Sequence, residues 1–109
     1  MSAVYIMASR KYGTLYIGVT SELVNRVVQH RDGLMEGFTK RYGVKRLVWF
    51  EHHDSIVVAI QREKSLKKWK RRWKVDLIEA GNPDWDDLFP GLIAEEGPLS
   101  HLQSPEPSL

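Results

Sequence analysis

Apolar and polar positions alternate at the start of the chain, with one interruption. Residues 4–8 and 14–20 have a period of two and are rich in β-branched and aromatic side chains, as strands are. Residues 9–13 between them have a turn-like composition, so a β-hairpin is predicted. Successive side chains of a strand point to opposite faces, so this parity allows Tyr5 and Tyr16 to share one face.

The period then changes to that of a helix. Ser21 suits an N-cap position, and a helix is predicted over residues 22–31. Residues 33–45 are predicted to form a loop with one helical turn at residues 39–42. Residues 46–52 are again β-branched and aromatic, which predicts a third strand.

The helical period returns after the third strand. Asp54 or Ser55 is predicted to cap a helix over residues 56–68. A second helical segment, continuous with the first or separate from it, covers residues 69–79. Residues 81–83, Gly-Asn-Pro, end it because proline cannot continue a helix.

This order of elements predicts a fold class. Strand, strand, helix, strand, helix, helix gives an α+β domain with a small, mostly antiparallel three-stranded sheet flanked by helices. A chain of 109 residues is one domain, which we expect to cover residues 1–93. Residues 94–109 are rich in Glu, Pro and Ser and are predicted to be a disordered acidic tail.

A few polar residues break the local pattern. Glu63 lies inside an apolar stripe, three residues after Ile60 and three before Leu66. A carboxylate on an inward face is costly unless it pairs with a base or binds a cation, so both readings stay open. Arg26 and His30 are four residues apart and share one face of the first helix, either as a solvated pair or as site residues.

Composition limits the protein class. The chain is 42% hydrophobic and 28% charged, as globular proteins are, and it has no cysteine. Disulfides and thiolate zinc sites are therefore excluded, which suits a reducing cytoplasm. We see no signal peptide and no apolar run near the roughly 20 residues of a membrane helix, so a soluble cytoplasmic protein is expected.

Charge points to a polyanionic partner. All 16 Lys and Arg residues lie between Arg10 and Lys74, whereas residues 80–109 hold six acids and no base. Such a body attracts nucleic acid, although an ordinary solvated surface would look the same. The basic residues expected to contact phosphates are Lys40, Arg41, Lys45, Arg46, Lys67, Lys68, Lys70, Arg71 and Arg72.

Together these positions resemble the GIY-YIG nuclease superfamily over about residues 3–85. The second signature is intact at residues 16–18, Tyr-Ile-Gly, and the first is Ala-Val-Tyr at residues 3–5, which keeps the tyrosine. The spacing of the two tyrosines and the Asn-Pro-Asp-Trp at residues 82–85 are also similar to short members. The matched polar positions are Tyr5, Tyr16, Arg26, His30, Glu63 and Asn82.

The resemblance implies a metal-dependent endonuclease that hydrolyses DNA phosphodiester bonds. Glu63 would be the one protein ligand of Mg²⁺ or Mn²⁺, because Mg²⁺ keeps waters and substrate phosphate as its other ligands. Arg26 would fork onto phosphate oxygens and stabilise the charge of the transition state.

The remaining matched residues receive roles by the same resemblance. Tyr5 or Tyr16 would orient and deprotonate the attacking water, and the sequence leaves open which one does so. His30 would relay the proton or hydrogen-bond a tyrosine hydroxyl. Asn82 would brace the site.

No element that reads a DNA sequence is visible, so structure-selective or weakly specific cleavage in repair or recombination is expected. We expect a monomer or weak dimer, and a partner protein is a candidate for directing it. One alternative is a non-catalytic nucleic-acid-binding module. Another is a basic helix that docks on membranes or acidic proteins, which would need exposed Trp69 and Trp73, although their helical spacing indicates core positions.

Overall fold

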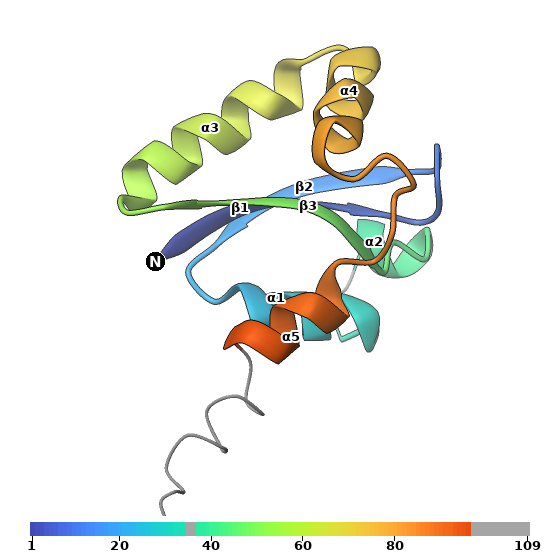
Figure 1. The fold of residues 1–109 in the computed structure, drawn as a ribbon, viewed down its shortest axis with the longest axis horizontal. Coiled ribbons are helices and arrows are strands. Elements are labelled where there is room, and N and C mark those ends of the chain that lie inside the picture. Colours follow the sequence, from blue (N-terminus) through green and yellow to red (C-terminus); the bar gives the residue numbers. More distant parts are fainter. Residues whose placement is uncertain (35–36, 97–109) are drawn as a thin grey trace, which may run out of the picture.

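Three antiparallel strands form a sheet that has helices on both faces (Figure 1). The computed structural model describes residues 1–34 and 37–96. Its elements are β1 (Ser2–Ala8), β2 (Leu15–Thr20), α1 (Leu23–Arg31), α2 (Phe38–Arg41), β3 (Arg46–His53), α3 (Ile56–Lys68), α4 (Arg71–Gly81) and α5 (Phe89–Glu96). The predicted fold class is confirmed.

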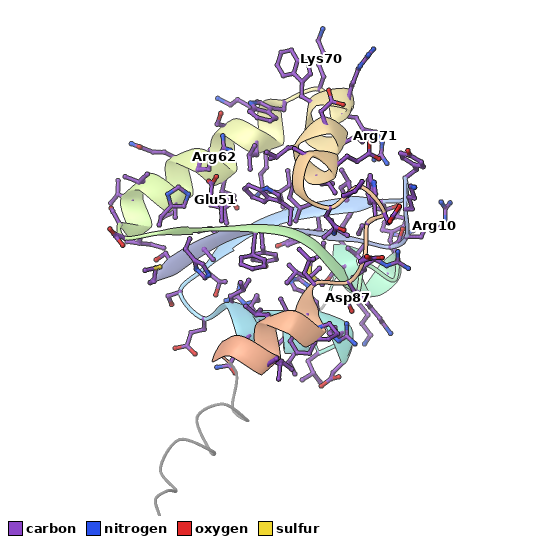
Figure 2. The ribbon with its side chains drawn as sticks, in the orientation of Figure 1. Arg10, Glu51, Arg62, Lys70, Arg71 and Asp87 are labelled. Atoms are coloured by element: carbon purple, nitrogen blue, oxygen red, sulfur yellow. The ribbon has the colours of Figure 1, made fainter. Side chains whose placement is uncertain are left out.

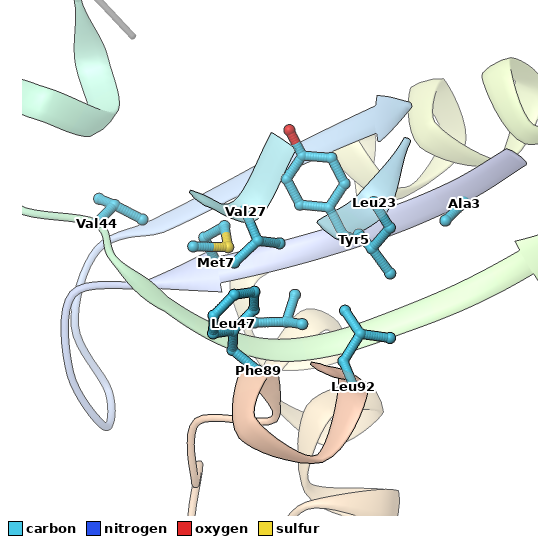
Figure 3. Packing of buried hydrophobic residues seen from close by; sticks show 9 residues of the cluster. All are labelled: Ala3, Tyr5, Met7, Leu23, Val27, Val44, Leu47, Phe89 and Leu92. Atoms are coloured by element: carbon cyan, nitrogen blue, oxygen red, sulfur yellow. The ribbon is translucent and has the colours of Figure 1, made fainter. Parts of the chain in front are cut away.

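The sheet order is β2-β1-β3, so the first strand is central. All seven residues of β1 are buried, because both of its faces are covered. On one face, here called the α1 side, Tyr5 and Met7 pack in a cluster with residues of α1 and α5 (Figure 3). On the opposite face, the α3 side, Val4 and Ile6 pack against α3 and α4. The hairpin and its predicted parity are therefore correct.

A β-bulge interrupts the pairing of β1 with β3. Ile6 pairs with Trp49 while Met7 pairs with Leu47, so Val48 has no partner on β1. An extra residue of this kind leaves its backbone groups outside the ladder. It also shifts the alternation, so that Val48 and Trp49 both pack on the α3 side. The sequence pattern alone did not reveal this bulge.

Helix ends follow the prediction in part. Ser55 is the N-cap of α3, and its hydroxyl accepts a hydrogen bond from the Val58 N–H at 3.4 Å. Ser21 was wrong as the cap of α1: residue 22 is the N-cap, and Thr20 Oγ1 accepts from its N–H at 2.9 Å. The extended backbone of Trp69 and Lys70 separates α3 from α4, so the two helices are not continuous.

The last helix, α5, was not predicted. Its Phe89 and Leu92 are buried on the α1 side, and Arg31 of α1 pairs with Asp87 just before it. The helix ends at Glu96, three residues beyond the predicted domain boundary. The tail predicted over residues 94–109 lies, from residue 97 onward, outside the described residues.

Two predictions, the core positions of Trp69 and Trp73 and the lack of a membrane-spanning helix, can be compared with the structure. Trp73 is 49% exposed, so its assignment to the core was wrong, whereas Trp69 is half-buried. The two indole rings pack edge to face at 6.1 Å between centroids. Within residues 1–34 and 37–96, no helix has the length and apolar character required to span a bilayer.

Candidate active site

The two matched tyrosines share the α1 side of the hairpin, as their parity predicts. The register pairs Tyr5 with Gly18 and Met7 with Tyr16, so the phenol rings are diagonal neighbours 6.3 Å apart between centroids. Gly18 has a steric reason to be glycine. A Cβ there would lie 2.5 Å from both Cζ and Oη of Tyr5, a distance that real Cβ atoms essentially never show. The Tyr5 ring therefore lies directly over the backbone of the Tyr-Ile-Gly motif.

His30 connects Tyr5 to helix α2. The Tyr5 Oη lies 3.0 Å from His30 Nε2, and His30 Nδ1 lies 3.1 Å from Thr39 Oγ1. The imidazole is buried, and burial, followed by the charge of Arg26, lowers its pKa. A neutral imidazole carries one N–H, so one ring nitrogen donates and the other accepts.

Arg26 acts on the Tyr5 end of this chain of hydrogen bonds. Hydrogen bonding from its guanidinium and its positive charge both lower the pKa of Tyr5. Arginine only donates, so it favours the arrangement in which the phenol proton is directed at His30 Nε2 and His30 Nδ1 donates to Thr39 Oγ1. This arrangement gives both ring nitrogens a partner with a single tautomer of His30.

The surroundings of Tyr5 hold its proton firmly. Burial, and after it the neighbouring Tyr16, raises the pKa of Tyr5 to about 12. Arg26 opposes this rise by hydrogen bonding and charge, while the Glu63 carboxylate adds to it. Tyr5 is 0% exposed, and its hydroxyl points away from Leu47 and Phe89 in Figure 3. Tyr16, by contrast, is half-buried.

Glu63 reaches the site from α3, on the opposite side of the sheet. Its side chain is 13% exposed, and Lys67 Nζ lies 3.0 Å from its Oε2 one helical turn further on. The sequence left open whether this carboxylate pairs with a base or faces a cation-binding site. The structure contains the ion pair, and it also brings Glu63 near enough to Tyr5 for its charge to act on the phenol.

The single carboxylate of Glu63 fits a hard cation whose other ligands are waters and substrate phosphate. Within the described part of the chain, no group of three or more His, Cys, Asp or Glu residues could hold a metal ion by itself. One carboxylate suits Mg²⁺, which is commonly bound through one or two carboxylates plus waters and substrate phosphate. Lys67 is 52% exposed, so its ammonium can leave the carboxylate without unpacking the core.

Asn82 lies away from the phenols and has a clear structural task. Its Nδ2 donates to the Val48 carbonyl at 3.1 Å and to the Asp86 carbonyl at 2.9 Å. Its Oδ1 accepts from the Asp86 N–H at 3.0 Å. Val48 is the bulge residue of β3, so Asn82 ties this strand to the segment after α4.

The basic residues predicted to bind phosphate differ in how they are held. Arg46 donates to the Trp85 carbonyl at 3.0 Å, and Arg71 donates to the Gly13 carbonyl at 2.6 Å, so both guanidinium groups also support loops. Lys70 lies at the outer end of α4 over the Trp73 ring (Figure 2). The side chains of this set that are mostly exposed are Lys40, Arg41, Lys45, Lys67, Lys68, Lys70, Arg71 and Arg72.

A groove of about 250 Å³ adjoins Tyr16. Its lining residues are Leu15, Tyr16, Ile17, Phe38, Lys67 and Lys74. Sequence reasoning missed Phe38 and Thr39 as residues of this region. Phe38 was read as loop and Thr39 as the start of one helical turn, which the structure contains as α2, and no spacing signal connects this segment to the hairpin.

Comparison with known proteins places the chain among similar small domains. It matches the family described as GIY-YIG catalytic domain over residues 1–76. A UPF0213 protein of Clostridium perfringens is 35% identical over 80 residues, which cover 73% of this chain and 85% of that protein. A UPF0213 protein of Staphylococcus saprophyticus is 32% identical over 71 residues, covering 65% and 87%. The solution NMR structure of a UPF0213 protein from Bacillus halodurans is 28% identical, with a TM-score of 0.50, and the match covers 80% of this chain and 93% of that one.

Proposed function

The chain belongs to the GIY-YIG nuclease family, and from this premise we propose that it is a DNA endonuclease that depends on Mg²⁺ or Mn²⁺. One observation carries the proposal. Within the matched domain, the phenol rings of Tyr5 and Tyr16 lie 6.3 Å apart between centroids, and the Tyr5 hydroxyl lies 3.0 Å from His30 Nε2. The charges of Arg26 on α1 and of Glu63 on α3 both act on the pKa of Tyr5. A guanidinium, a carboxylate and phenols are groups that can serve the hydrolysis of a phosphodiester.

We assign to Tyr16 the role of orienting and deprotonating the attacking water. A base must reach its proton, and Tyr16 is half-buried and lines the groove, whereas Tyr5 is 0% exposed. The pKa of Tyr5 is also raised to about 12, which makes this phenol a poor base at neutral pH. Tyr16 therefore orients the water and, in its phenolate form, accepts the proton of that water, whereas Tyr5 acts as a positioning residue.

Tyr5 is the neighbour that orients Arg26. The hydrogen bonds from Tyr5 to His30 and from His30 to Thr39 fix the direction of the phenol, and Arg26 acts on this phenol by charge and hydrogen bonding. A guanidinium held in this way is directed at the nonbridging phosphate oxygens before the charge on them grows. Loss of one such donor typically costs about 10²–10³-fold in rate.

Glu63 is the residue that would hold the divalent ion. When bound, the ion neutralises charge on the scissile phosphate. The exposed cations on α3 and α4 contribute affinity for the phosphate backbone, which carries no sequence information. We extend the proposal to weakly specific or structure-selective cleavage in DNA repair or recombination, in the cytoplasm, with a partner protein as the means of choosing a site.

A second candidate function is a nucleic-acid-binding module without catalysis. The ion pair between Glu63 and Lys67 favours it, because a carboxylate that is permanently neutralised by an ammonium cannot hold a cation. The two functions differ in the role of Glu63. In the nuclease the carboxylate is essential for cleavage, and in the module it contributes only to the stability of α3.

The test compares two carboxylates that are both paired with basic side chains. Glu63→Gln should abolish Mg²⁺-dependent cleavage of plasmid, branched and single-stranded DNA while DNA binding persists. Glu51→Gln is the matched control. Glu51 belongs to β3, outside the site, and it pairs with His53 of the same strand and with Arg62 of α3 (Figure 2). This variant should leave cleavage intact. Cleavage by Glu63→Gln at the wild-type rate, or no cleavage by the wild type on any of these substrates, would overturn the proposal.

A further inference from the structure

The groove beside Tyr16 runs along the free edge of the sheet. β2 is an outer strand, and three consecutive residues of it line the groove. Leu15 and Ile17 belong to the α3 side, while Tyr16 faces the α1 side. The groove therefore follows the rim of the sheet, and it lies next to the proposed water-orienting phenol.

One wall of the groove is aromatic. Phe38 of α2 is 47% exposed, and its ring centroid lies 6.3 Å from that of Tyr16, at an interplanar angle of 31°. Tyr42, which is 49% exposed, continues the series at 4.9 Å from Phe38, and the Arg41 guanidinium lies over its ring. Exposed aromatic side chains in a row provide flat faces on which nucleobases stack, with a cation–π contribution from arginine.

The opposite wall is cationic. Lys67 of α3 and Lys74 of α4 line it, and Lys74 Nζ lies 3.5 Å from the Lys67 carbonyl, so the Lys74 ammonium lies beside the end of α3. Lysines at the side of an aromatic surface suit a ligand that is flat and apolar on one side and anionic on the other. A nucleotide has this division between its base and its phosphate.

We propose that this groove binds one unpaired nucleobase of a DNA strand, stacked on Phe38, with the adjacent phosphates on Lys67 and Lys74. The proposal rests on the proposed nuclease function and makes it more specific, because it selects single-stranded or locally unpaired DNA as the substrate class. A volume of about 250 Å³ is slightly below the roughly 300–1,000 Å³ of drug-sized pockets, so it suits one ring system and excludes a duplex. A base inside a duplex would have to leave its stack to enter.

The test measures binding in the presence of a chelator, so that cleavage plays no part. The probes are a single-stranded oligonucleotide that contains one fluorescent purine analogue and a duplex of the same sequence. Phe38→Leu keeps the apolar bulk but removes the stacking face, and Phe38→Trp restores it. Tyr12→Leu is the matched control, because Tyr12 is 59% exposed and lies in the turn between β1 and β2, against Trp85.

We expect the wild type to bind the single strand more tightly than the duplex and to quench the analogue. Phe38→Leu should weaken single-strand binding by about fivefold or more and abolish the quenching, since stacking of one base is worth about 1–3 kcal/mol. Its duplex binding should change less than about twofold, as expected for contacts with phosphates alone. Phe38→Trp should restore both signals, and Tyr12→Leu should change neither.

The outcomes separate the two proposals. If Phe38→Leu binds the single strand as the wild type does, or loses affinity for both probes equally, the base-binding groove is wrong. If the binding results are as expected but the wild type cleaves no DNA in Mg²⁺, the groove stands and the nuclease proposal fails. If the wild type cleaves duplex and single strand at equal rates and Phe38→Leu has no effect on either, the nuclease stands and the groove fails.

Discussion

Gly18→Ala tests whether the glycine of the Tyr-Ile-Gly motif exists to make room for Tyr5. The added Cβ would lie 2.5 Å from Cζ and Oη of Tyr5 and 2.9 Å from Cε1. These are atoms of a rigid ring, and Tyr5 is 0% exposed in the cluster on the α1 side, so the ring cannot move without displacing its neighbours. In an open strand position the same change would be mildly stabilising, by roughly 0.5–1 kcal/mol.

The expected magnitude combines two costs. Overpacking a filled site costs about 1–3 kcal/mol, and a displaced Tyr5 loses its hydrogen bond to His30, worth about 1 kcal/mol. We therefore expect Gly18→Ala to lower the free energy of unfolding by about 2–4 kcal/mol. Arg26 loses its acceptor at the same time, so cleavage should fall with stability.

The assay is urea unfolding of the wild type, Gly18→Ala, Tyr5→Val and the double variant, which together form a double-mutant cycle. In a Tyr5→Val background the ring is gone, and Gly18→Ala should be neutral or stabilising, so the coupling between the two positions should reach at least about 2 kcal/mol. Gly81→Ala is the matched control, because its Cβ would meet nothing within 4 Å and it ends a helix. Wild-type stability of Gly18→Ala, or an equal loss in the Tyr5→Val background, would refute the steric reasoning.

Four further predictions concern single residues of the site. Asn82→Ala should cost about 1–3 kcal/mol in urea unfolding, because buried carbonyls lose their donor. The pKa of His30 is lowered in the folded protein, so protonation favours the unfolded chain and the stability of the wild type should fall as the pH drops below about 6.5. In His30→Gln, the change in Tm between about pH 7 and 5 should be smaller than in the wild type. Tyr16→Phe should reduce cleavage by about 10²-fold or more, measured against DNA affinity that stays unchanged. Lys67→Met should tighten Mn²⁺ binding in calorimetry by freeing Glu63, and unchanged affinity would mean that the ion pair does not compete with the metal.

The parts of the fold that were predicted correctly are those that local pattern determines. The period of two located the hairpin, and the Ser55 cap gave the start of α3 at the observed residue. Helix α5 escaped prediction because Pro90 and Gly91 lie in its first turn and have low helix propensity. Burial of Phe89 on the α1 side stabilises it instead, which is a contact between segments far apart in sequence.

Only those residues of the candidate site that are related by regular helical or strand spacing could be predicted together from the sequence. Residues four apart on a helix are neighbours, so Arg26 and His30 could be paired from the sequence. Thr39, the second partner of His30, lies nine residues further on in α2, and no regular spacing connects the two positions. Trp73 fits the helical spacing of a core residue, yet the break at Trp69 turns α4 away from α3 and leaves it half exposed.

The position of β2 at the rim of the sheet explains how a site can draw on both faces. The matched phenols lie on the α1 side, while Glu63 and the lysines of the groove come from helices on the α3 side. Tyr5 belongs to the central strand, whereas Tyr16 belongs to the edge strand. At an edge the layer of backbone ends, so residues of both sides line one groove there. A large residue at Gly18 would displace the Tyr5 ring from its place beside this rim. Residues of β3 also bear on the position of this ring, because Leu47 and Phe50 pack in the same cluster as Tyr5.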